Sequence, residues 1–146
     1  MGVLTDFVVA NAKDAQRVGD SLNPSAEFNG LEAKGVTGIE LGQLYCVLEG
    51  ISDRDAILDS FMTEALYQAS EYGPWVHEVP QALTEWLALL DEGQLRAAAV
   101  EWVKCEELSL DGPCPPEAVE WFLRDLAKLA QQAVDQRKSI LLWTSL

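Results

Sequence analysis

The last nine residues of the chain, 138–146, constrain the fold more than any other stretch. They read Lys-Ser-Ile-Leu-Leu-Trp-Thr-Ser-Leu, so that apolar side chains stand almost together. Such a run, with β-branched and aromatic residues among leucines, is typical of a strand that is covered on both faces of a sheet. This strand needs partners from elsewhere, and residues 3–10, Val-Leu-Thr-Asp-Phe-Val-Val-Ala, are the best candidate. We therefore expect both termini to meet in one sheet.

A third strand is predicted in the middle of the chain, at residues 75–79. The sequence there, Trp-Val-His-Glu-Val, alternates enough for a short strand and follows a Tyr-Gly-Pro break. Residues 25–35, by contrast, are mixed in character and spaced by glycines, and we expect a loop there that is pinned by Phe28 and Leu31. The sheet is therefore expected to have about three strands.

Five to six helices are predicted around this sheet. Thr37 and Glu40 match the Ser/Thr-x-x-Glu form of a capping box, so a helix should begin at this threonine, and Gly50 should end it. The clearest helix follows Pro116, because its apolar side chains fall within a narrow sector while its charged side chains face away. The other helices are expected at residues 13–22, 52–69, 80–90 and 91–107.

The length and composition of the chain indicate one globular unit. A chain of 146 residues buries about two thirds of its unfolded surface in a single core. Its apolar fraction of 49%, with 23% charged residues, is typical of a globular protein. We expect residues 1–146 to form a single α+β domain, in which a small sheet built from both termini and a middle strand is packed by five to six helices.

The net charge of −14, from 24 acidic and 10 basic side chains, bounds the possible partners. Nucleic acid is not expected, because there is no Lys/Arg cluster to displace counterions from phosphates. No membrane association is expected either, since the longest apolar run is far shorter than a membrane span. The start of the sequence lacks the pattern of a secretory signal, so we expect a cytoplasmic location. The acidity indicates either solubility alone or attraction of a cationic partner.

The usual sequence signatures of catalytic and metal sites are missing. The chain has no GxxxxGKS/T or GxGxxG motif, its three cysteines share no CxxC spacing, and it has one histidine, His77. We therefore expect no metal and no cofactor. The pattern is more typical of a binding protein than of an enzyme.

Two residues are nevertheless candidates for a pocket with acid/base or cation-binding groups. His77 lies in the predicted middle strand, where it could act alone as an acid or base, or be satisfied by a carbonyl or carboxylate. Glu106 follows the buried stripe of the predicted helix 91–107, one turn beyond Trp102. A carboxylate held beside an indole has its charged form disfavoured and can donate a proton. If the helix ends earlier, Glu106 faces water instead.

The tryptophans include two candidate binding residues. Trp86, Trp102 and Trp143 fall on apolar stripes and are expected in the core. Trp121 falls on the polar side of the last helix, and Trp75 lies beside a Gly-Pro turn. Exposed tryptophans are typical anchors of protein interfaces. Either side chain could equally be covered by a neighbouring loop.

Four segments carry a resemblance to a known family. They are the start Met1-Gly2-Val3 leading into a strand, the helix end at residues 44–50, the segment from Gly73 through Pro80 into a helix, and the final helix with its strand. With these segments the chain resembles the YfbM-like family of small uncharacterised bacterial proteins. The resemblance implies an α+β fold and no established activity. That family tends to place a tryptophan and a histidine where this chain has Leu41 and Gly42. The resemblance therefore does not support a site in this chain that uses that histidine.

Three functional hypotheses follow. The first is a non-catalytic protein-binding module that engages another protein, or a copy of itself, through an acidic face that includes Trp121 or Trp75. The second is a small enzyme or ligand-binding protein with a pocket that uses His77 and Glu106. The third is an immunity or antitoxin-like protein that neutralises a basic toxin, which the size and acidity of the chain allow.

Overall fold

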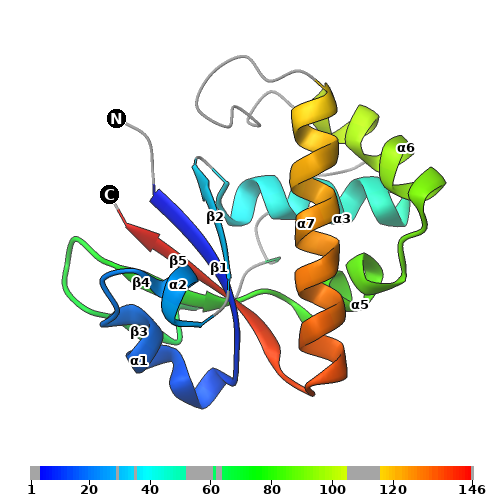
Figure 1. The fold of residues 1–146 in the computed structure, drawn as a ribbon. Helices are drawn as coiled ribbons and strands as arrows, with labels where there is room; N and C mark the ends of the chain where they lie inside the picture. The colour runs from blue at the N-terminus through cyan, green and yellow to red at the C-terminus, as the bar shows by residue number, and fades with distance from the viewer. Residues whose placement is uncertain are drawn as a thin grey trace.

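The computed structural model describes residues 4–28, 30–34, 36–51, 61, 64–104 and 116–145. Its strands are β1 (Leu4–Ala10), β2 (Leu31–Lys34), β3 (Tyr67–Gln68), β4 (Trp75–Glu78) and β5 (Ser139–Ser145). They form one antiparallel sheet of five strands in the order β2-β1-β5-β4-β3. Helices cover both faces, and the predicted α+β class is therefore confirmed (Figure 1).

The two terminal strands pair along their whole length at the centre of the sheet. The register runs from Leu4 opposite Ser145 to Ala10 opposite Ser139, and β1 and β5 lie side by side in Figure 1. Leu141 and Leu142 are both buried although they point to opposite faces, because each face of β5 is covered. The predicted meeting of both ends in one sheet is confirmed.

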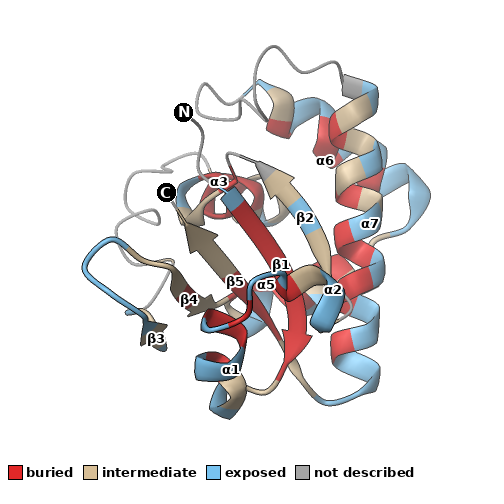
Figure 2. Ribbon diagram, turned by 60° about the vertical axis from the view of Figure 1, so that its left-hand side comes forward, coloured by how far each residue is buried: buried red, intermediate tan, exposed pale blue. Residues whose placement is uncertain are grey.

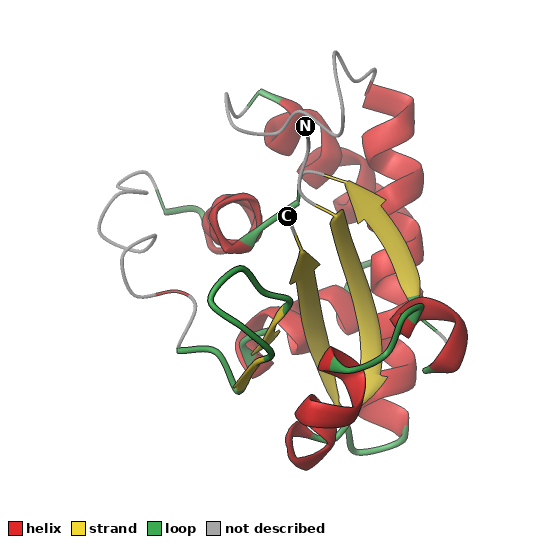
Figure 3. Ribbon diagram, turned by 90° about the vertical axis from the view of Figure 1, so that its left-hand side faces the viewer, coloured by secondary structure: helices red, strands yellow, loops and turns green. Residues whose placement is uncertain are grey.

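The larger core lies on one face of this sheet. Four helices build it: α3 (Gly38–Glu49), α5 (Gln81–Leu89), α6 (Glu92–Val103) and α7 (Pro116–Asp135). The apolar stripe of α7 packs against the sheet and the neighbouring helices, and Phe7 of β1 lies edge-on to Phe122 at 6.0 Å between ring centroids. Figure 3 shows α7 behind the sheet and the small helices in front of it. We call this face the inner face.

In the described part of the chain, the opposite, outer face carries only small elements. They are a short 3-10 helix at Ala12–Asp14, α1 (Ala15–Gly19) and α2 (Pro24–Glu27). Val18 of α1 packs there with Val8, Val76 and Leu141 in a second, smaller core. The red and blue ribbon of Figure 2 shows β1 buried while much of α1 and α2 stays exposed. Part of the outer face is therefore left accessible beside α2.

The helix signals in the sequence act as expected. Thr37 caps α3 in a capping box with Glu40, and Gly50 follows the helix with φ of 72°, a left-handed conformation that favours glycine. Asp91 and Gln94 form a second capping box on α6. Both predicted helix starts are confirmed. None of the described helices is long and apolar enough to cross a membrane.

The number of strands was predicted wrongly. Residues 25–35 are not a loop throughout, since they contain the end of α2 and the edge strand β2. Residues 64–69 are not helical, and β3 lies within them. Of the rest of the expected helix 52–69, Phe61 is helical, and residues 52–60 and 62–63 are outside the described part. Strands of four and two residues are too short to show a period, and they form because β1 and β4 offer backbone groups that must be paired.

Candidate functional site

The outward face of α7 carries the most exposed of the predicted site residues that the structure describes. Trp121 has 65% of its surface exposed, more than any other large apolar side chain described in α7, of which Val134 is the next at 41%. Glu117 and Asp125 lie four residues before and after it, which places both on the same side of the helix, and both are exposed. An indole flanked by two carboxylates therefore faces solvent. We call Glu117, Trp121 and Asp125 the α7 face.

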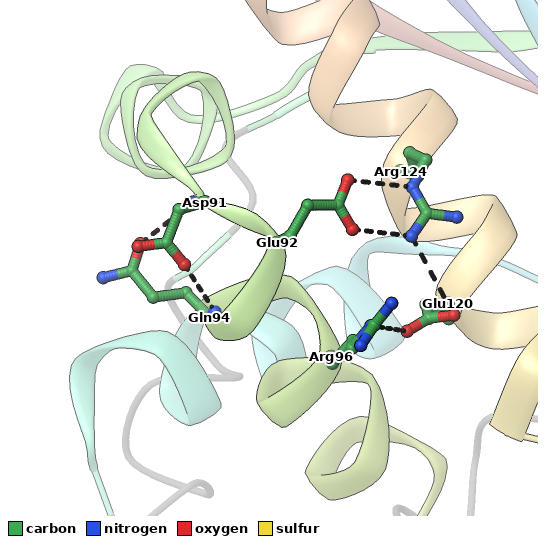
Figure 4. A network of polar contacts seen from close by, with 6 residues as sticks. All are labelled: Asp91, Glu92, Gln94, Arg96, Glu120 and Arg124. Carbon is green, nitrogen blue, oxygen red and sulfur yellow. Dashed lines mark hydrogen bonds and ion pairs between the residues drawn. The ribbon is translucent and has the colours of Figure 1, made fainter.

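A network of ion pairs holds α7 against α6 beside this face (Figure 4). The Arg124 guanidinium donates from Nε to Glu92 Oε1 at 3.2 Å and from Nη2 to Glu92 Oε2 at 2.8 Å. Glu120 forms an ion pair with Arg96 on α6, with 3.2 Å between Oε1 and Nε, and lies 3.9 Å from Nη2 of Arg124. The hydrogen bond from Arg124 lowers the pKa of Glu92. Because Arg124 and Glu120 form ion pairs with residues of α6, the helix that carries the α7 face is fixed to its neighbour.

Two other predicted site residues, Trp75 and His77, lie in β4 and are half-buried. The half-buried ring of Trp75 packs over Gly73, where an added Cβ would lie 2.6 Å from the ring. His77 is half-buried on the inner face opposite Leu142, and burial lowers its pKa. Glu78 points to the opposite face and accepts a hydrogen bond from Ser139 Oγ at 2.6 Å. Glu106 is outside the described residues, so the predicted pair of His77 and Glu106 has no described geometry.

A groove on the outer face brings together residues that the sequence patterns did not single out. Its volume is about 380 Å³, and it lies between the outer face of the sheet and the segment that leads into α2. The groove is lined by the following residues: Leu4, Thr5, Asp6, Leu22, Asn23, Pro24, Glu32, Ala33 and Trp143. We call this the sheet groove. In the described part of the chain, no group of three or more His, Cys, Asp and Glu residues is placed to hold a metal.

The floor of the sheet groove is a row across three strands. Asp6 of β1 stands opposite Glu32 of β2 on one side and opposite Trp143 of β5 on the other. Residues that stand opposite one another in antiparallel strands point to the same face. The register therefore places two carboxylates and an indole next to one another, although they lie far apart in the sequence.

Asp6 is the most unusual member of this row. Only 7% of it is exposed, and its Oδ2 accepts a hydrogen bond from the backbone N–H of Ser25 at 3.0 Å. Burial raises the pKa of this carboxyl, the bonds from Ser25 oppose that effect, and the charge of Glu32 adds to it. Among the described residues, no basic side chain forms an ion pair with Asp6 or Glu32. A desolvated acid thus lies beside a second acid without a described counter-ion.

One signal in the sequence could have identified Asp6. It is the only charged residue in the otherwise apolar strand 3–10, and a charge inside a central strand is costly unless it has a use. No comparable signal marks Glu32 or Trp143. The first lies in a segment predicted as a loop, and the second was expected in the core but is only half-buried.

The raised pKa of Asp6 predicts a specific dependence of stability on pH. A carboxyl whose pKa is higher in the folded than in the unfolded protein binds its proton more tightly when folded. Its contribution is therefore lost as the pH rises from about 3.8 through the raised folded value. We expect Asp6→Asn, which keeps an acceptor for Ser25, to be more stable than the wild type above this window and to lose that advantage below it. Urea unfolding of both proteins over a pH series measures the difference, and a constant difference at every pH would contradict it.

Comparison of the chain with protein-family models, curated proteins and solved structures found no match. The resemblance to the YfbM-like family therefore stays a prediction. Two surfaces of the described residues bear on the function. These surfaces are the α7 face and the sheet groove.

Proposed function

We propose that the protein is a non-catalytic protein-binding module that engages a partner carrying basic side chains through the α7 face. The observation that carries this proposal is the 65% exposure of Trp121 on a helix whose apolar stripe is otherwise turned inward. Exposure of an indole to water is unfavourable, and burial of the indole against a partner would contribute to the free energy of binding. Tryptophan is also among the residues that most often dominate the energy of protein interfaces.

The charges around Trp121 favour a basic partner over a second copy of this chain. Glu117 and Asp125 flank the indole, and the whole chain carries a net charge of −14. Two copies that met through this face would bring like charges together, whereas a basic surface would be attracted over a distance and would pair at the rim. Self-association is thus the weaker form of the proposal.

A pocket that uses His77 is the alternative proposal. Burial lowers the pKa of this imidazole, which keeps it neutral and able to accept a proton near neutral pH. The described part of the chain offers no hydrogen bond or ion pair to it. Its proposed partner Glu106 lies outside the described residues, so the α7 face has the stronger support.

We expect Trp121→Ala to weaken binding of the partner by a factor of about 30, which corresponds to about 2 kcal/mol, because an interface anchor of this size would be removed. The partner is first captured from host lysate at low and at high salt, and its affinity is then measured by titration calorimetry. Release by high salt is expected for a basic partner. The double variant Glu117→Gln with Asp125→Asn should reduce the association rate and its dependence on salt.

Leu89→Ala is the matched control, since Leu89 is 79% exposed at the end of α5 and away from the α7 face. It should bind the partner like the wild type. Equal affinities of the wild type and Trp121→Ala for every captured protein would overturn the proposal. Loss of binding in both variants would show that exposed apolar surface in general, and not this face, drives capture.

A further inference from the structure

We propose that the sheet groove is a second binding site, for the ammonium or guanidinium end of a lysine or arginine side chain in a peptide segment. The site is formed by Asp6, Glu32 and Trp143 on the sheet, with Leu4 and Leu22 at the rim. It lies on the outer face, whereas α7 packs on the inner face. The inference therefore does not depend on binding through Trp121.

The carboxylates define the charge of the ligand. Asp6 is more than nine tenths buried and stands directly opposite the exposed Glu32, so a desolvated carboxylate lies next to a second negative charge. A cation placed between them would offset the desolvation cost of Asp6 and the repulsion between the two charges. Lys34 follows Glu32 in the same strand, and its side chain is outside the described part of the chain. The test therefore includes a variant of Lys34, because its ammonium group could compete with a ligand for Asp6 and Glu32.

The walls of the groove define the shape of the ligand. Leu22 is 100% exposed and Leu4 is 48% exposed, although both line the groove. These leucines and the indole of Trp143 provide apolar surface for an aliphatic stem, and an indole face also attracts a cation. A volume of about 380 Å³ suits a single long side chain better than a folded domain. Lysine and arginine combine such a stem with a charged end.

The indole N–H of Trp143 indicates that the ligand is a peptide and not a free amine. Its Nε1 is buried and has no hydrogen-bond partner among the described residues. A buried donor without an acceptor is rare in folded proteins and costs free energy until it is paired. Trp143 lines the groove, so a peptide carbonyl that reaches this N–H as the ligand binds would supply the acceptor, and a simple amine has none. A metal ion is less suitable, since indole does not ligate metals and two carboxylates leave most of a coordination shell empty.

The test uses three small probes on the full chain. They are N-acetyl-lysine methylamide, N-acetyl-norleucine methylamide, which lacks the charge, and pentylamine, which lacks the peptide groups. Heteronuclear NMR follows the indole N–H signal of Trp143, identified by its loss in Trp143→Phe. We expect the lysine probe to shift this signal with a millimolar dissociation constant, the norleucine probe to leave it unchanged, and pentylamine to bind about tenfold more weakly than the lysine probe.

Variants of the carboxylates separate the site from general attraction to an acidic protein. Asp6→Asn and Glu32→Gln should each weaken binding of the lysine probe by about tenfold or more, because each removes one of the two charges. Glu27→Gln, which neutralises an exposed carboxylate in α2 beside the groove, should bind like the wild type. The amide spectrum of Asp6→Asn checks that this variant is folded. Lys34→Gln should leave the affinity unchanged or raise it.

Several outcomes would overturn the inference. They are the absence of a shift with the lysine probe in both the wild type and Lys34→Gln, an equal shift with the norleucine probe, and unchanged affinity in Asp6→Asn. Equal binding of pentylamine would contradict the peptide ligand. Trp121→Ala should bind the lysine probe like the wild type, so failure of the sheet groove and failure of the α7 face give different patterns.

Discussion

Trp102→Ala is expected to lower the free energy of unfolding by about 3–5 kcal/mol. Trp102 is fully buried on α6, and its indole Nε1 donates to the backbone carbonyl of Glu40 in α3 at 2.9 Å. Its ring lies 6.1 Å from that of Phe122 on α7, measured between centroids. Truncation would therefore open a cavity among three helices and leave a buried carbonyl without its donor.

The matched control is the same substitution at the exposed tryptophan of α7, Trp121. Because 65% of it is exposed, Trp121→Ala should change the free energy of unfolding by less than about 0.5 kcal/mol. Trp102→Phe separates the cost of the cavity from the cost of the lost hydrogen bond, since it keeps an aromatic ring but removes the donor to the Glu40 carbonyl. Urea unfolding followed by circular dichroism measures all three variants. Similar losses for Trp102→Ala and Trp121→Ala would contradict the buried position of Trp102.

Gly30→Ala is expected to destabilise the protein by about 3 kcal/mol, the upper part of the usual range for overpacking. An added Cβ at this position would lie 2.1 Å from the backbone carbonyl oxygen of Phe7 and 2.9 Å from Cγ1 of Val8. Phe7 belongs to the strand at the centre of the sheet, and its backbone cannot move without disturbing the pairing with β5. The close approach, and not a left-handed backbone, requires glycine here.

Gly93→Ala serves as the control for this prediction. An added Cβ at Gly93, in the first turn of α6, would meet only Oδ1 of Asp91 at 3.5 Å, an ordinary contact. Alanine lowers the conformational entropy of the unfolded chain, so the free energy of unfolding should stay the same or rise by about 0.5 kcal/mol. Urea unfolding compares the two variants. A Gly30→Ala protein as stable as the wild type would show that the segment before β2 moves to admit the methyl group.

The sequence was most informative where neighbouring residues interact with one another. The capping residues Thr37 and Asp91 act on amides three positions or fewer away, and the apolar stripe of α7 repeats with the helix period. The same period showed that Trp121 is turned away from the core. The long apolar runs at both ends were sufficient to predict that β1 and β5 are central strands.

The tertiary structure alone decided which distant residues meet. The short strands β2 and β3 have no period of their own, and they exist because the ends of the sheet pair their backbone groups with them. The register of β1 with β2 and β5 then brings Asp6, Glu32 and Trp143 into one row. Helix caps and stripes depend on contacts a few residues apart, which can be read along the chain. The sheet groove depends on strand register, which is set only when the whole sheet assembles.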